Sequence, residues 1–295
     1  MHNLNLLLLF FFFFFLFLSP TLTKSLSDPP PSTDVGGGGG KHFVLVHGAC
    51  LGAWSWYKLS TLLRSAGHRV TALDMAGAGI DPREAERLKS FNEYVEPLRN
   101  LMGEVGEEEK VILVGHSQGG LCISKAMEEF PEKISVAVFV VAAMPGPALN
   151  ASFLIGQLRK WLDFGPDSHY TYGNGPRSPP TTLTFGPLFL AAKVFNKSPL
   201  EDLTLGRTLV RPTHLFGGEQ WNKDLVLTKE RYGSVKRVFV VSDNDKVIKK
   251  SFQKWVIRRN PPDGVVEVKG SDHMVMMSKP LHLFNILSHI ARQHS

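Results

Sequence analysis

The stretch at residues 111–120 constrains the fold of this chain more than any other. Its first four residues are apolar and predict a buried strand, and apolar residues at helical spacing follow at 121–130. Between these two segments, Gly115, Ser117 and Gly119 match the pattern Gly-x-Ser-x-Gly. On so tight a strand-to-helix turn, the serine adopts a strained backbone conformation that exposes its hydroxyl, and flanking side chains would collide with neighbouring backbone. The pattern therefore predicts a nucleophile elbow.

Length and composition are those of an ordinary globular enzyme. The 295 residues are 43% apolar and 20% charged, which suits one domain with an inserted subdomain and a substantial core. The net charge of +6 includes no dense Lys/Arg run, so nucleic acid is not expected as a partner. Cys50 and Cys122 indicate no disulfide framework and are expected to be small buried residues.

Neither a metal nor an organic cofactor is expected from the motifs of the chain. No Cys/His cluster at zinc spacing occurs in the sequence. The glycine run at residues 36–40 follows no predicted strand and lacks the Lys-Ser/Thr pair of a phosphate-binding loop. The expected partner is therefore a small-molecule substrate alone.

The first forty residues are excluded from the predicted fold. Residues 6–18 are thirteen consecutive Leu and Phe residues, which are too few for a membrane span of about twenty but match a signal-peptide core. A Pro/Gly-rich linker follows, so residues 1–40 are interpreted as a targeting segment and a linker. The secretory route is favoured, with a short anchor, a plastid address or a cytoplasmic location as alternatives.

Strands and helices alternate along residues 41–295, which predicts a mostly parallel sheet flanked by helices. The expected strands are 41–46, 69–73, 111–114, 134–143, 235–241 and 265–268. The expected helices are 54–65, 91–102, 121–130, 252–259 and a last one capped by Ser278 with Pro280 in its first turn. The alternation fails at about 149–207, where Pro, Gly and aromatics predict an inserted lid. With the elbow, this pattern predicts the α/β-hydrolase fold.

A serine nucleophile requires a base and a carboxylate to orient that base, in the chain order Ser, acid, His. His273 is the predicted base because it lies in a loop just after the last strand. Asp243 and Asp245 both follow the preceding strand; Asp245 is preferred as the acid because the first aspartate is expected to cap the turn. Asp272 adjoins the base, but successive side chains point apart, which disfavours it as the orienting group.

The negative oxygen that forms during attack on an ester needs preorganised N–H donors. One donor is expected from the residue after the nucleophile, Gln118, and the other from the first strand–helix loop. In that loop Ala49 follows His47 and Gly48, so its backbone N–H is assigned as the second donor.

Several segments resemble the plant methylesterase and hydroxynitrile lyase family. They are residues 43–50, 52–58, 70–74, 111–117, 233–238 and 269–274. The resemblance runs from about residue 41 to the end, and the lid is less similar. In this family the acid lies 28 positions before the histidine, which implies Asp245 beside Ser117 and His273. The lid residue Trp161 is implied to line the acyl pocket.

The two branches of this family differ at three positions. The lyases have Thr after the first-loop histidine, Glu before the nucleophile, and Lys after the catalytic histidine. This chain has Gly48, His116 and Met274 there. Because the lysine's charge stabilises departing cyanide, the resemblance implies the esterase branch, with Met274 as a substrate-binding residue. Gln118 replaces an apolar residue that is frequent in relatives, so the sequence leaves open the polarity of the pocket and with it the preferred substrate.

The expected function is a carboxylesterase that hydrolyses methyl esters of small apolar carboxylic acids through a Ser-His-Asp triad and an acyl-enzyme. The resemblance suggests esters of plant hormones, such as methyl jasmonate, methyl salicylate or methyl indole-3-acetate, and allows a homodimer. A hydroxynitrile lyase and a slow-turnover hormone-binding receptor of the same fold remain as alternatives.

Overall fold

The structure, a computed structural model, describes residues 40–294 of the chain. The targeting segment and nearly all of the linker expected at residues 1–40 therefore lie outside the described residues. Among residues 40–294, no helix combines the length and apolar character that crossing a membrane requires.

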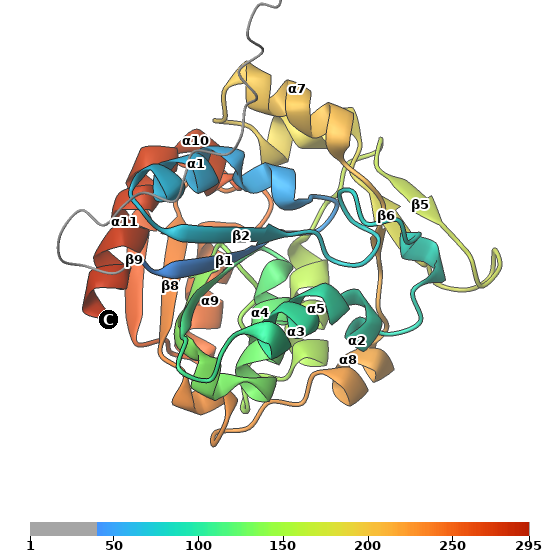
Figure 1. Ribbon diagram of the computed structural model, residues 1–295. Helices are drawn as coiled ribbons and strands as arrows, with labels where there is room; N and C mark the ends of the chain where they lie inside the picture. Colours follow the sequence, from blue (N-terminus) through green and yellow to red (C-terminus); the bar gives the residue numbers. More distant parts are fainter. Residues whose placement is uncertain (1–39, 295) are drawn as a thin grey trace, which may run out of the picture. The chain divides into compact units, whose positions relative to one another are not determined.

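A six-stranded parallel sheet forms the centre of the described domain (Figure 1). Its strands are β1 (His42–Val46), β2 (Arg69–Leu73), β3 (Val111–His116), β4 (Ile134–Val140), β8 (Arg237–Ser242) and β9 (Gly264–Val268). They lie in the order β2-β1-β3-β4-β8-β9. From β1 the chain passes to β2 on one side and then to β3 on the other side of β1. The loops that follow β1 and β3 therefore diverge, which creates a switch point in the sheet. Ligands of open α/β sheets bind at such a point.

Helices cover both faces of this sheet. One layer holds α1 (Tyr57–Ser65), α10 (Val275–Ser278) and α11 (Pro280–Gln293), which contact one another. The other layer includes α2 (Phe91–Tyr94), α3 (Glu96–Glu104) and α4 (Gly119–Glu129), and α4 packs on β3 and β4. A further helix, α9 (Lys250–Arg259), contacts β8. The alternation of strand and helix predicted by the sequence is therefore confirmed for the α/β part of the chain.

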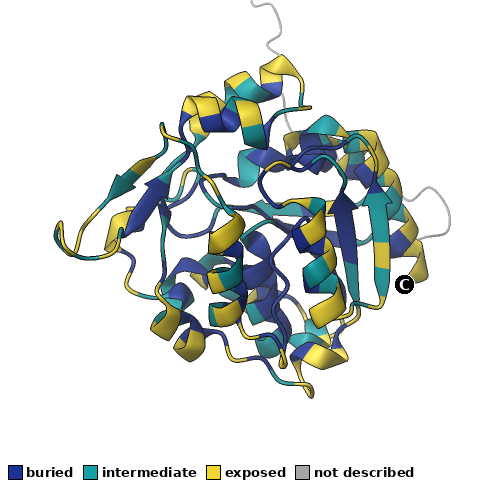
Figure 2. Cartoon of the chain, turned by 180° about the vertical axis from the view of Figure 1, so that it is seen from behind, coloured by how far each residue is buried: buried dark blue, intermediate teal, exposed yellow. Residues whose placement is uncertain are grey.

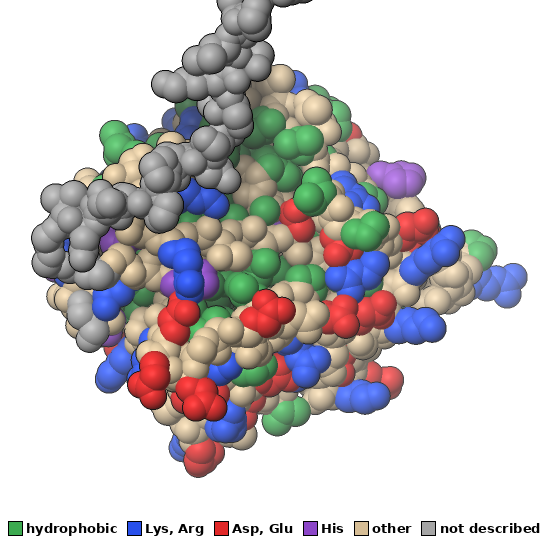
Figure 3. Space-filling model, viewed as in Figure 1, with side chains coloured by type: hydrophobic (Ala, Val, Ile, Leu, Met, Phe, Trp, Pro, Cys, Tyr) green, Lys and Arg blue, Asp and Glu red, His purple; other side chains and the backbone are tan. Residues whose placement is uncertain are grey.

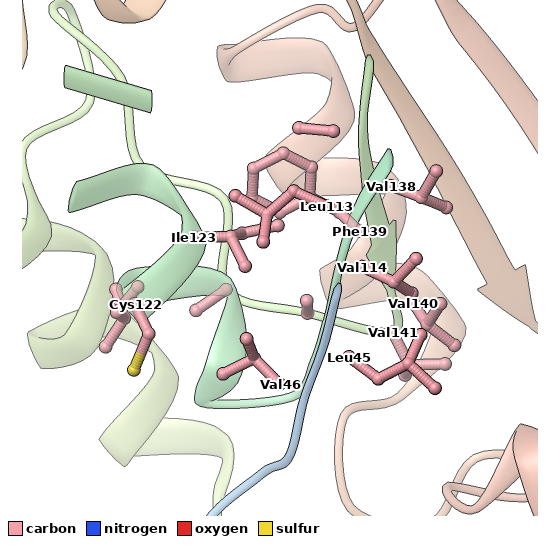
Figure 4. Close-up of a cluster of buried hydrophobic side chains, with 14 of the residues drawn as sticks. Leu45, Val46, Leu113, Val114, Cys122, Ile123, Val138, Phe139, Val140 and Val141 are labelled. Carbon is pink, nitrogen blue, oxygen red and sulfur yellow. The ribbon is translucent and has the colours of Figure 1, made fainter. Parts of the chain in front are cut away.

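The core lies between the sheet and its helices, as the dark strands at the centre of Figure 2 show. Side chains of β1, β3, β4 and α4 meet there, with Cys122 among them (Figure 4). Both cysteines are buried and free, and burial raises the pKa of the Cys50 thiol to about 12. At that pKa the thiol stays protonated at neutral pH, so the interpretation of the cysteines as buried packing residues is confirmed.

Between β4 and β8 the chain builds the lid. It contains α5 (Ala151–Trp161), β5 (His169–Thr171), β6 (Thr182–Thr184), α6 (Pro187–Phe189), a π-helical turn η4 (Leu190–Val194), α7 (Leu200–Leu209), β7 (Thr213–His214) and α8 (Gly218–Asp224). β5, β6 and β7 form a small antiparallel sheet, and α5 lies beside α8 (Figure 1). The small sheet was not predicted, and through β7 it extends beyond the lid boundary expected at residue 207.

Three predicted elements differ in detail from the structure. The helix expected at residues 91–102 is broken at Val95 into α2 and α3, because Pro97 in the first turn of α3 has no N–H to continue a helix. The strand expected at 134–143 ends at Val140, and Val141 has a left-handed φ of 49°. Ser278 ends α10 rather than capping the last helix, whose first residue is Pro280.

Basic and acidic side chains are interspersed on the molecular face of Figure 3, with apolar side chains between them. That face therefore presents no broad surface of one sign.

Candidate active site

The elbow after β3 has the backbone geometry that its sequence predicts. Ser117 has a φ of 53°, in the left-handed region. A Cβ at Gly119 would lie 2.6 Å from the carbonyl oxygens of Val46 and His47, and one at Gly115 would lie 2.9 Å from the carbonyl oxygen of Gly119. Only glycine fits these two positions, because the start of α4 lies so close to the end of β1 and to Gly115 in β3. The strained turn thereby presents the Ser117 hydroxyl at the edge of the sheet.

Three side chains from distant parts of the chain form one hydrogen-bonded series. Nε2 of His273 lies 3.1 Å from Oγ of Ser117, and Nδ1 of His273 lies 2.8 Å from Oδ2 of Asp245. The other oxygen of Asp245 accepts the N–H groups of Val247 and Ile248 at 2.7 and 2.9 Å. Since every oxygen of this buried carboxylate has a donor, its orientation is fixed. Because Nδ1 of His273 is bound to this carboxylate, the orientation of the imidazole is fixed as well.

The other aspartates near the base have structural partners. Asp243 accepts the N–H of Gly270 at 2.7 Å, which ties the turn after β8 to the turn after β9. Asp272 accepts the N–H of Lys197 and the hydroxyl of Ser198 on one oxygen, at 2.9 and 2.8 Å. Neither aspartate contacts the ring of His273, so of the sequence candidates only Asp245 is placed to orient the base.

His47 controls the peptide between Gly48 and Ala49. Nε2 of His47 accepts the N–H of Met75 at 3.1 Å, so Nδ1 carries the proton and donates it to the carbonyl oxygen of Gly48 at 2.8 Å. Burial lowers the pKa of His47, which keeps the ring neutral. In a trans peptide the C=O and N–H point in opposite directions, so the N–H of Ala49 is turned away from His47.

The two assigned oxyanion donors lie beside the nucleophile. Ala49 and Gln118 both line the pocket that contains Ser117. Neither backbone N–H has a hydrogen-bond partner among residues 40–294, so both are available to an incoming oxygen. The side chain of Gln118 instead accepts a long hydrogen bond, 3.5 Å, from the hydroxyl of Thr213. The Gln118 side chain is thus part of the pocket wall.

His116 supports the base from behind. Its Nε2–H donates to the carbonyl oxygen of His273 at 2.9 Å, and the two rings lie 4.7 Å apart. Burial, followed by the charge of His273, lowers the pKa of His116 well below the usual value. Nδ1 of His116 is buried and has no partner in the described part of the chain. A neutral His116 therefore links the strand of the nucleophile to the loop of the base.

A mostly apolar pocket opens above Ser117. The volume of this cavity is about 110 Å³, and its mouth is open to solvent. The apolar lining residues are Ala49, Leu121, Ala143, Ile155, Leu158, Leu162, Phe164, Leu183, Phe185, Leu215, Phe216, Trp221, Val247 and Ile248. The polar ones are Ser117, Gln118, Arg159, Thr213, His214 and His273. Within residues 40–294, no cluster of three or more His, Cys, Asp or Glu side chains is placed to hold a metal ion.

Trp161 and Met274 do not line this pocket, which corrects both expectations. Trp161 is 52% exposed, and its ring lies 6.2 Å from that of Phe252 on α9. Met274 is fully buried in the core and is not among the residues that line the pocket, although its neighbour His273 is. Its backbone N–H is held by Asp272 at 2.9 Å.

Sequence reasoning missed the face of α5 that does line the pocket. Ile155, Leu158, Arg159 and Leu162 recur at the i, i+3, i+4, i+7 spacing of one helical face, whereas Trp161 lies about 100° from Leu162 around the helix. Asn150 caps this helix by accepting the N–H of Phe153. The cap and the spacing are both visible in the sequence and predict a helix with one apolar face, whereas the cavity that this face lines is set by the packing of the helix.

The sequence and the fold of the chain are similar to those of known proteins. The model of the alpha/beta hydrolase family matches residues 43–285. The chain is 52% identical over 256 residues to methyl jasmonate esterase 1 of Vitis vinifera, covering 86% of this chain and 98% of that protein. It is 47% identical over 262 residues to salicylic acid-binding protein 2 of Nicotiana tabacum, covering 87% and 99%. A crystal structure of tomato methylketone synthase I complexed with 2-tridecanone is 51% identical, with a TM-score of 0.84, covering 87% and 99%.

Proposed function

The chain belongs to the plant methylesterase family of α/β-hydrolases and is a carboxylic ester hydrolase, and we propose that it cleaves methyl esters of small apolar carboxylic acids through Ser117, His273 and Asp245. One observation carries this proposal: the hydrogen-bonded series from Ser117 to Asp245 lies at the wall of a mostly apolar pocket. The pocket supplies the apolar environment for the acyl group, and the series supplies the nucleophile and its base.

The reaction follows from the geometry of the site. As Oγ of Ser117 attacks the ester carbonyl, Nε2 of His273 takes its proton across 3.1 Å. Asp245 stabilises the resulting imidazolium through Nδ1–H, and the N–H groups of Ala49 and Gln118 receive the oxyanion. His273 then returns the proton to the leaving methoxide, which departs as methanol. Water, activated by the same histidine, hydrolyses the acyl-serine to the free acid.

Methyl jasmonate, methyl salicylate and methyl indole-3-acetate are the proposed substrates to examine first. The names of two relatives, methyl jasmonate esterase 1 and salicylic acid-binding protein 2, support the first two. The panel also includes the methyl ester of β-ketoheptanoate, because one crystal structure of tomato methylketone synthase I, 50% identical and with a TM-score of 0.84, is complexed with that acid. These acyl groups differ in ring structure and chain length, so their relative rates report how the lid shapes the pocket.

The test is methanol release from this panel by the purified protein, with Ser117→Ala as the control variant. We expect Ser117→Ala to lower kcat by about 10⁴-fold or more while the free acid still binds. Hydrolysis that survives this substitution would place the chemistry elsewhere. Tight acid binding without steady-state hydrolysis by the unaltered protein would instead support the receptor alternative.

The lyase alternative is tested by cyanide release from mandelonitrile under the same conditions. Met274 is buried away from the pocket and carries no charge, so nothing at this position stabilises departing cyanide. We expect ester hydrolysis to be the faster reaction, and cyanide release at a higher rate would contradict the proposal.

A further inference from the structure

One side chain in the pocket wall has a permanent charge. Arg159 is the single Lys, Arg, Asp or Glu among the described residues that line the pocket. It lies on the face of α5 that also presents Leu158 and Leu162, in the same cavity as Ser117. The residue as a whole is exposed, which places it toward the mouth of the pocket and the nucleophile deeper inside. A cation at this position is not required by the cleavage of an uncharged ester.

The guanidinium of Arg159 is held in place but is not neutralised. Its Nη2 donates to the carbonyl oxygen of Phe216, another residue of the pocket wall, at 3.2 Å. No carboxylate among residues 40–294 lies within ion-pair distance of it. Burial lowers the pKa of Arg159, because the cation has lost part of its hydration without gaining a counter-charge. Four of its five N–H donors therefore remain available to a ligand.

Some arginines elsewhere in the fold are paired with a carboxylate. Arg99 pairs with Glu129 at 2.7 Å, although it is well exposed to solvent. Arg83 is paired with Asp81 at 2.8 Å and also with Glu96. Other arginines, Arg207 and Arg211 among them, also lack a carboxylate partner in the described part of the chain, so what distinguishes Arg159 is its place in the wall of the cavity that contains Ser117. A negatively charged group on the substrate would supply the counter-charge that Arg159 lacks.

We propose that Arg159 binds a carboxylate at the far end of the substrate, so that among methyl esters with an apolar acyl chain the protein prefers those whose chain ends in a carboxylate, the monomethyl esters of dicarboxylic acids. This inference rests on the proposed function, since the other end of the same substrate is the ester attacked by Ser117. The planar guanidinium binds a carboxylate through two parallel hydrogen bonds, which a lysine cannot reproduce. The apolar wall formed by Leu158, Leu162 and Phe216 suits the hydrocarbon spacer between the two groups.

The experiment compares monomethyl suberate with methyl octanoate, two esters of equal chain length that differ in the terminal carboxylate. The readout is the ratio of their kcat/KM values on one preparation, so any loss of active protein cancels. We expect the unaltered protein to prefer monomethyl suberate over methyl octanoate by about tenfold or more. Arg159→Met, which keeps an apolar stem, brings the ratio close to one, and Arg159→Lys retains an intermediate ratio.

Lys160→Met provides the matched control. Lys160 neighbours Arg159 on α5, is exposed, and lies outside the pocket lining. The control therefore removes the same charge from the same helix while the preference stays at the value of the unaltered protein. A series of monomethyl esters from glutarate to sebacate then gives the chain length that best spans the distance from Ser117 to Arg159.

A ratio near one for the unaltered protein, or an equal ratio before and after Arg159→Met, would overturn this inference. If Lys160→Met lowered the ratio as much as Arg159→Met, the cause would be general electrostatics and the proposal would equally fail. Failure of the proposed function is distinguishable, because then neither ester is hydrolysed in a Ser117-dependent manner. Should Arg159→Met not fold, competitive inhibition of the unaltered protein by suberate against octanoate decides the question, with tighter suberate binding expected.

Discussion

Replacement of Asp245 by asparagine tests how the orientation of His273 is set. One carboxylate oxygen of Asp245 accepts two backbone N–H groups, at 2.7 and 2.9 Å, and the other accepts Nδ1–H of His273 at 2.8 Å. In Asp245→Asn the amide carbonyl must keep the two backbone donors, because an NH₂ group there would face two N–H groups. The NH₂ group therefore takes the position opposite Nδ1 of His273.

This arrangement selects the wrong tautomer of the imidazole. To accept a hydrogen bond from the new NH₂ group, Nδ1 must be unprotonated, so Nε2 carries the hydrogen and cannot take the proton of Ser117. We expect kcat/KM for a methyl ester to fall by about 10³- to 10⁴-fold, which corresponds to about 4–5.5 kcal/mol of lost transition-state stabilisation. KM should change little, because the substituted side chain lies behind the imidazole and keeps its size.

Asp243→Asn is the matched control for this measurement. Asp243 accepts the N–H of Gly270 at 2.7 Å and an amide hydrogen of Asn244 at 2.8 Å on the same oxygen, so the amide oxygen of an asparagine can keep both bonds. We expect methanol release by Asp243→Asn to stay within about threefold of the unaltered protein, since neither hydrogen bond has to be lost and Asp243 does not contact the ring of His273. Equal rates for the two asparagine variants, or full activity of Asp245→Asn, would refute the reasoning.

Two further substitutions test the supporting histidines. His47→Phe releases the carbonyl of Gly48 and with it the orientation of the Ala49 N–H, so we expect kcat to fall by about 10- to 100-fold with KM little changed in steady-state assays; an unchanged kcat would contradict this. His116 is neutral in the folded protein because burial lowers its pKa, whereas in the unfolded chain it is protonated below about pH 6.5. Below this pH the unfolded chain binds a proton at His116 that the folded protein does not bind. The contribution of neutral His116 to the free energy of unfolding is therefore full above about pH 6.5 and is lost as the pH falls. In urea titrations from pH 7.5 to 5.0, His116→Gln should reduce this loss by up to about 1.4 kcal/mol per pH unit, and parallel curves for the two proteins would contradict the assignment.

The arrangement of Ser117, Asp245 and His273 could be predicted because each residue lies in the loop or turn that follows a strand of one parallel sheet. Ser117 follows β3, Asp245 follows β8 and His273 follows β9, and the carboxyl ends of parallel strands meet at one edge. The elbow pattern supplies the first position from local sequence, and chain order supplies the other two. The sequence alone left Asp243 beside Asp245 as the acid, because the direction of each carboxylate depends on the turn that joins it to the base.

The pocket wall could not be predicted in the same way, because it is made by the lid. The direction in which a residue of α5 points depends on the rotation of this helix about its axis, which is set by its packing against α8. The resemblance placed Trp161 in the pocket, yet a rotation of about 100° separates it from the lining residue Leu162. Arg159 was missed for the same reason: a charged residue on a helix is taken as solvent-facing until the helix is placed.

Asp272 connects the lid to the catalytic base, and this contact has a consequence for substrate selection. One oxygen of Asp272 holds the backbone of Lys197 and the hydroxyl of Ser198 in the lid, and the other holds the N–H of Met274, directly after His273. A lid that moves to admit a larger acyl group therefore pulls on the loop that positions the imidazole. Because one carboxylate joins this part of the lid to the loop of the base, we expect substitutions there to change KM and kcat together rather than KM alone in steady-state assays.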